Sequence, residues 1–88
     1  MTNDIRLLSE EELKEYYLSE LTIFESLVEE LENVEVKRKI EKYIPAIQER
    51  CNSVTALRIS KEIGYLDNSD YLKDKLYRKL KSLHFYKI

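Results

Sequence analysis

The sequence predicts a mainly α-helical domain. Three observations carry this prediction: apolar residues recur at helical spacing along most of the chain, one glycine and one proline are present, and 43% of the residues are hydrophobic. Helical spacing of apolar side chains indicates amphipathic helices, and a chain so poor in glycine and proline lacks the turns of a β-rich fold. Its 88 residues make one small domain, for which we expect a lead-in at residues 1–8 and the domain itself at residues 9–88.

The first predicted helix spans residues 9–32 and is long, acidic and amphipathic. Ser9 suits an N-cap, and Glu12, three residues later, completes a capping box. An a/d seam of apolar residues follows, at Leu13, Tyr17, Leu21, Phe24, Val28 and Leu31. This seam either packs against the rest of the same domain or also pairs with a second copy. We expect a homodimer through these six residues.

The second predicted helix covers residues 36–51, and Pro45 lies inside it. Because proline lacks a backbone donor and clashes with the carbonyl four residues back, we expect a kink near residues 41–44, or a break with Pro45 opening a new segment. Cys51 is the one cysteine, which excludes a disulfide framework or a cysteine-based zinc site within one chain. We expect it to be a buried or half-buried hydrophobic residue.

Two more helices are predicted at residues 55–64 and 69–83, joined by a short polar turn. Ser53 or Thr55 is expected to cap the first, and Asn68 or Ser69 the second. Gly64 suits the left-handed position that ends a helix. Residues 85–88 alternate in a way that permits a short strand. The predicted core consists of Leu21, Phe24, Val28, Ile40, Ile44, Ile47, Ile59, Ile63, Leu66, Leu72, Leu76, Leu80 and Leu83.

A short helix, a turn and a longer helix are the skeleton of a helix-turn-helix unit. The segment ISKEIG resembles the first motif helix of the winged-helix/helix-turn-helix superfamily, and KLYRKLKSLHFYKI resembles the end of its recognition helix running into a wing strand. The resemblance covers residues 54–88. It implies a helix-turn-helix at residues 55–83 with a short or missing wing, serving as a DNA-binding or protein-docking module.

Charge is divided unevenly along the chain, although the net charge is only −2. Residues 1–33 carry ten acidic and two basic residues, a net charge of −8, whereas residues 34–88 carry seven acidic and thirteen basic residues, a net charge of +6. A basic half of this kind can face phosphates while the acidic half faces away or contacts something else.

We therefore expect a DNA-binding protein, a small transcriptional regulator or a replication or plasmid-maintenance factor, that reads duplex DNA with its last helix. Arg78 and Lys81 lie at the outward face of that helix, where they can reach bases or phosphates. The predicted DNA contacts are Arg58, Lys61, Ser69, Lys73, Lys75, Tyr77, Arg78 and Lys81. Asp70 and Asp74 argue against DNA binding by this helix because carboxylates repel phosphate. Asp74 also suits an i,i+4 ion pair with Arg78.

The alternative is a non-enzymatic interaction subunit that docks on a protein through the helix-turn-helix or through the acidic first helix. An enzyme is not expected. One glycine cannot form a phosphate-binding loop, the serines lack a histidine-based activation pattern, and a lone His84 suits a structural or surface role. We expect no metal and no cofactor. No apolar run approaches the ~18 residues of a membrane helix, and the first residues lack a signal-peptide pattern, so we expect a cytoplasmic protein.

Overall fold

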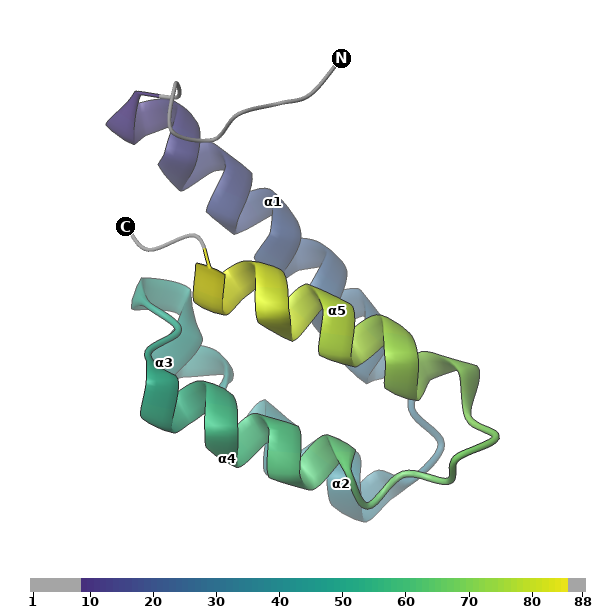
Figure 1. Ribbon diagram of the computed structural model, residues 1–88. Coiled ribbons are helices and arrows are strands. Elements are labelled where there is room, and N and C mark those ends of the chain that lie inside the picture. Colours follow the sequence, from purple (N-terminus) through teal and green to yellow (C-terminus); the bar gives the residue numbers. More distant parts are fainter. Residues whose placement is uncertain (1–8, 86–88) are drawn as a thin grey trace.

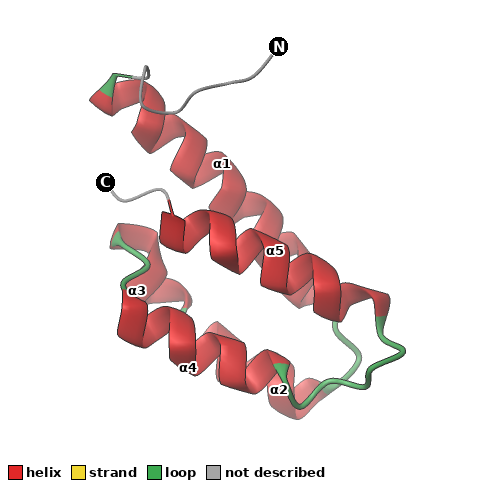
Figure 2. Cartoon of the chain, viewed as in Figure 1, coloured by secondary structure: helices red, strands yellow, loops and turns green. Residues whose placement is uncertain are grey.

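The computed structural model describes residues 9–85, which fold into five α-helices (Figure 1). The helices are α1 (Glu10–Glu29), α2 (Val34–Glu41), α3 (Ile44–Glu49), α4 (Ser53–Ile63) and α5 (Tyr71–Phe85). The part of the chain that the structure describes contains no strand (Figure 2). The mainly helical prediction is confirmed. The predicted lead-in and residues 86–88 of the predicted strand lie outside the described residues, while Phe85 is helical.

Ser9 is the N-cap of α1, as predicted, and Glu12 is its side-chain partner, although the Glu12 carboxylate accepts from the Ser9 hydroxyl and not from the Ser9 backbone N–H of a full capping box. Ser9 Oγ accepts a hydrogen bond from the backbone N–H of Glu12 at 3.2 Å and donates one to the Glu12 carboxylate at 3.0 Å. The helix ends at Glu29, three residues before the predicted end. The chain then bends into α2, whose N-cap is Asn33, because the Asn33 side chain accepts from the backbone N–H of Val36 at 3.1 Å.

Pro45 separates α2 from α3, so the predicted break is confirmed. α2 ends at Glu41, and Pro45 lies in the first turn of α3. A proline is tolerated there because the first backbone N–H groups of a helix have no intrahelical partner. The segment predicted as one helix is therefore two short helices that meet at an angle (Figure 1).

Three predicted helix ends are wrong in detail. Asn52, not Ser53 or Thr55, caps α4, accepting from the Thr55 backbone N–H at 2.8 Å. Gly64 is right-handed, with φ −60°. The chain leaves α4 through i→i+3 hydrogen bonds from Tyr65 and Leu66, which require no left-handed residue. α5 begins at Tyr71, where the Asp70 side chain accepts from the Leu72 backbone N–H at 2.9 Å.

α5 lies between α1 and α4 and packs against both, while α2 packs against α1 and α4 and α3 packs against α1 (Figure 1). The buried apolar residues form one cluster: Tyr17, Leu21, Phe24, Leu27, Val28, Leu31, Val36, Ile40, Ile47, Cys51, Ile59, Ile63, Leu66, Leu72, Leu76, Leu80 and Leu83. The predicted core residues are all in it except Ile44, which is half-buried. Burial of Cys51 confirms its expected hydrophobic role, and raises the pKa of its thiol to about 11.

The apolar seam of α1 faces the inside of its own domain. Tyr17, Leu21, Phe24, Val28 and Leu31 are buried within the single chain, and Leu13 is half-buried. The Tyr17 hydroxyl donates to the backbone carbonyl of Ile47 in α3, and burial raises the pKa of Tyr17 to about 12. The five buried side chains are therefore not exposed to a second copy, and a dimer needs other residues.

Candidate functional site

α4 and α5 lie side by side in opposite directions (Figure 1). At one end the Ser53 hydroxyl is 3.1 Å from His84 Nε2, and near the middle the Tyr77 hydroxyl donates to the Ser60 carbonyl at 3.4 Å. A helix-turn-helix crosses its helices at a steep angle and joins them with three or four residues. Here seven residues, 64–70, join helices that remain in contact along their length. The two helices pack as an antiparallel pair, as in an αα-hairpin but with a connection longer than the usual about 2–5 residues, and a groove lies between them.

The groove between α4 and α5 is apolar and open. Two adjoining hollows share Leu57, Ser60 and Tyr77 and so form one continuous surface. Its other lining residues are Ser53, Ala56, Lys61, Gly64, Tyr65, Leu80, Lys81 and His84. Leu57 is 72% exposed and Tyr65 is 65% exposed, so large apolar side chains stand in solvent here. Leu57 lies two residues before the buried Ile59, which turns its side chain about 200° away from the core stripe of α4. This spacing in the sequence is the signal from which its exposure could have been predicted.

Lysines flank this groove on both sides, since Lys61 comes from α4 and Lys81 from α5. The exposed charged residues of α4 and α5 comprise five basic residues and one acidic residue, a net charge of +4: Arg58, Lys61, Lys75, Arg78, Lys81 and Asp74. Asp74 is itself paired with Arg78 at 3.0 Å. The outer side of the hairpin is therefore cationic.

Two of the residues predicted to contact DNA, Ser69 and Lys73, form hydrogen bonds within the turn between α4 and α5. Lys73 Nζ donates to the Asn68 side chain at 2.8 Å and to the Leu66 carbonyl at 3.3 Å. Ser69 donates to the Asp67 carboxylate from its backbone N–H at 3.0 Å and from its hydroxyl at 3.1 Å. These Ser69 hydrogen bonds lower the pKa of Asp67. Both predicted contacts thus have local structural partners.

Three further predicted contacts have partners on α4 or α5. Tyr77 donates to α4 as described, Arg78 pairs with Asp74, and Lys75 Nζ lies 5.0 Å from the centre of the Tyr71 ring. The side chains of Arg58, Lys61 and Lys81 have no hydrogen bond or ion pair with any residue in 9–85. Of the eight residues predicted to contact DNA, five therefore have side-chain partners within the domain, and the other three are exposed cations.

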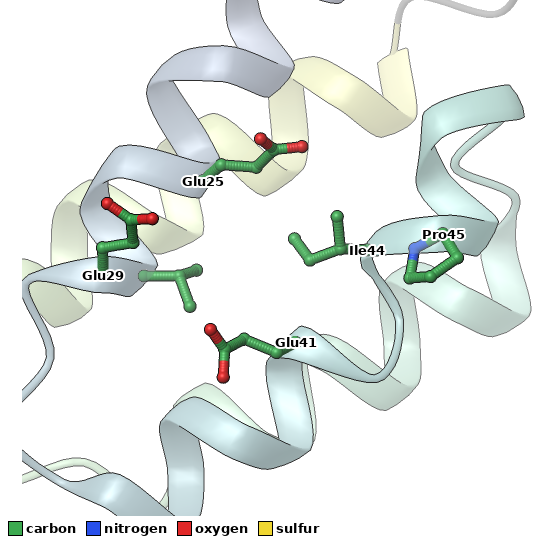
Figure 3. A pocket seen from close by; sticks show the side chains of 6 residues that line it. Glu25, Glu29, Glu41, Ile44 and Pro45 are labelled. Atoms are coloured by element: carbon green, nitrogen blue, oxygen red, sulfur yellow. The ribbon is translucent and has the colours of Figure 1, made fainter.

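A second hollow, of opposite charge, lies between α1 and the α2–α3 junction (Figure 3). Val28, Ile44 and Pro45 supply its apolar surface, and the carboxylates of Glu25, Glu29 and Glu41 surround it. The described part of the chain contains no group of three or more His, Cys, Asp or Glu side chains that could hold a metal ion.

Among the described helices, none combines the length and the apolar character that crossing a bilayer requires. No protein-family model, curated protein or solved structure matches this chain.

Proposed function

We propose that this chain is a protein-interaction module whose α4–α5 groove binds an acidic amphipathic helix. The observation that carries this proposal is the open apolar groove containing Leu57 and Tyr65, flanked by two lysines without partners among the described residues. Exposed apolar surface rimmed by polar residues is typical of interaction sites. A helix in a groove is a recurring way to cover such surface.

Burial of the apolar surface of the groove would favour binding of a helical ligand. Covering a fully exposed leucine stabilises a complex by ~1.5–3 kcal/mol, and Leu57 is 72% exposed, so most of that amount remains to be gained. Phosphate gains nothing from contact with the apolar side chain of Leu57 or with the ring face of Tyr65, although the Tyr65 hydroxyl can donate a hydrogen bond to it. The apolar character of the groove therefore favours a protein ligand over nucleic acid.

The shape and charge of the groove define the ligand. Two helices that lie side by side leave a furrow into which the side chains of a third helix can interdigitate. Lys61 and Lys81 stand on its two sides, so a ligand with carboxylates flanking its apolar stripe meets opposite charge on both.

A fluorescence-anisotropy titration tests the proposal. The probe is a labelled, designed helix of about 18 residues, with leucines at i, i+3, i+4 and i+7 and glutamates elsewhere; the control peptide carries lysines in place of the glutamates. We expect the acidic peptide alone to bind, and Leu57→Gln to weaken its binding by about tenfold or more. Val54→Gln is the matched control, since Val54 is an exposed apolar residue of α4 that does not line the groove. Equal binding by Leu57→Gln and wild type would refute the proposal.

Duplex DNA binding is a second candidate. The five exposed cations on the outer side of α4 and α5 favour it, with the two helices in the roles of a helix-turn-helix. Asp74, on the same face of α5, opposes it. Replacing the peptide by labelled duplex DNA in the same titration distinguishes the two candidates.

A further inference from the structure

We infer that the helix that fills the α4–α5 groove is α1 of a second copy, so that the chain forms a two-fold dimer. This inference rests on the proposed function, because it uses the same groove and names its occupant. The two surfaces involved are the groove and one edge of α1, which consists of Glu12, Glu15, Tyr16 and Ile23 and is called the α1 edge below.

The α1 edge borders α5. Glu20 of α1 pairs with Lys79 of α5 at 2.8 Å. Tyr16 lies four residues before Glu20 and Ile23 three residues after it, so all three share one stripe of the helix. The opposite edge of α1 carries Glu25 and Glu29, which face α2 and α3 (Figure 3). The α1 edge and the groove therefore lie on either side of α5.

The chemistry of the α1 edge matches the ligand that the groove selects. Tyr16 is 37% exposed and Ile23 is 41% exposed, which gives an apolar pair seven residues apart on one helix face. Glu12 and Glu15 are exposed beside them. The edge is thus a short acidic amphipathic surface, whereas the exposed charges of α4 and α5 sum to +4.

A two-fold axis parallel to α5 joins these surfaces twice. Rotation about such an axis turns one copy over, so that its α1 edge lies on the partner's groove and its groove receives the partner's α1 edge. In this isologous interface every contact is made twice, and the assembly closes at two copies. A chain with an acidic edge and a cationic groove is complementary to itself, and the two-fold arrangement fills the groove of both copies in a closed dimer.

A charge-swap experiment tests the dimer by sedimentation equilibrium at tens of micromolar. One variant carries Lys61→Glu and Lys81→Glu, and the other carries Glu12→Lys and Glu15→Lys. Wild type should sediment at twice its 10.6 kDa mass. Each variant alone should be monomeric, because its groove and edge carry the same sign. An equal mixture should regain the dimer, because both interfaces then pair opposite charges. Arg38→Glu with Lys42→Glu makes the same charge change at exposed residues near the end of α2 and should leave the wild-type dimer intact.

The result that overturns the inference is a monomeric wild type, a Lys61→Glu/Lys81→Glu variant that dimerises like wild type, or a mixture that stays monomeric. Circular dichroism verifies that each variant is folded. All substituted residues are exposed, and Glu12→Lys also removes the hydrogen bond from the Ser9 hydroxyl at the start of α1, so its helix content is compared with that of wild type. A monomeric wild type that still binds the designed acidic peptide through Leu57 would remove the dimer but leave the proposed function. Loss of both the dimer and peptide binding would remove both.

Discussion

Glu20 and Lys79 join the two longest helices of the protein through a pair separated by 59 positions in the chain. Their side chains are only 10% and 30% exposed, whereas those of the neighbouring pair Asp74 and Arg78 are 69% and 79% exposed. Water screens an exposed pair strongly and a half-buried pair much less. Loss of one partner from the half-buried pair also leaves the other charge poorly solvated.

We predict that the coupling energy of Glu20 and Lys79 exceeds that of Asp74 and Arg78. Double-mutant cycles with Glu20→Gln and Lys79→Met should give ~1–3 kcal/mol in urea denaturation, and cycles with Asp74→Asn and Arg78→Met no more than ~0.5 kcal/mol. The second cycle is the matched control, because both pairs place a basic partner on the same helix. Equal couplings would mean that burial at the α1–α5 contact does not strengthen the pair.

Among the helical elements, α4 ends without the left-handed residue that its glycine suggested. Gly64 keeps right-handed dihedral angles, and its N–H donates to the Ser60 carbonyl at 3.0 Å. A Cβ placed there would lie 3.2 Å from the Lys61 carbonyl and 3.5 Å from the Tyr77 hydroxyl. The tight contact is therefore with the backbone of α4 itself, whereas the Tyr77 hydroxyl of α5 lies at an ordinary van der Waals distance, and the backbone conformation is one that any residue can adopt.

We predict that Gly64→Ala raises the free energy of unfolding, by up to ~1 kcal/mol, because alanine restricts the unfolded chain and accepts these dihedral angles. The close Lys61 carbonyl reduces the gain. Had Gly64 been left-handed, the same substitution would cost ~1–2 kcal/mol. Urea denaturation measures the sign, and a loss of that size would contradict the right-handed assignment.

At the scale of the whole molecule, two hollows of opposite charge lie between different pairs of helices. The acidic hollow lies between α1 and the α2–α3 junction, and the cationic groove lies between α4 and α5. α5 keeps the two apart, because it contacts α1 on one side and α4 on the other. The cationic groove could bind either an acidic helix or nucleic acid. The dependence of the affinity on salt concentration distinguishes the two ligands. Release of counterions makes DNA affinity fall steeply with salt, whereas burial of Leu57 and Tyr65 depends little on it.

If duplex DNA binds, Lys61→Ala should weaken all sequences about equally and flatten the plot of log affinity against log salt by ~1 unit. Arg78→Ala should cost ~1–3 kcal/mol and relax preference at one base position. Fluorescence anisotropy with mixed duplex fragments at several salt concentrations measures both effects. Unchanged affinity in Arg78→Ala would leave Arg78 as the partner of Asp74 alone, and no binding at low salt would exclude this candidate.

The sequence by itself determined the features that depend on neighbours within a few residues. Ser9 caps α1 and hydrogen-bonds the Glu12 side chain because the two residues are one helical turn apart. Pro45 breaks the second helix because its ring and missing N–H act on its own backbone. The leucines of α5 are buried because their spacing keeps them on one face.

Only the tertiary structure decided which surfaces remain exposed. The apolar seam of α1 has the same spacing whether its partner is α5 of the same chain or a second copy, because the hydrophobic effect is non-directional and does not depend on the origin of the partner. The pairing of Glu20 with Lys79 and the groove beside Leu57 arise only once α5 has docked between α1 and α4. Residues far apart in the chain form these features, and local spacing carries no information about which distant helices meet.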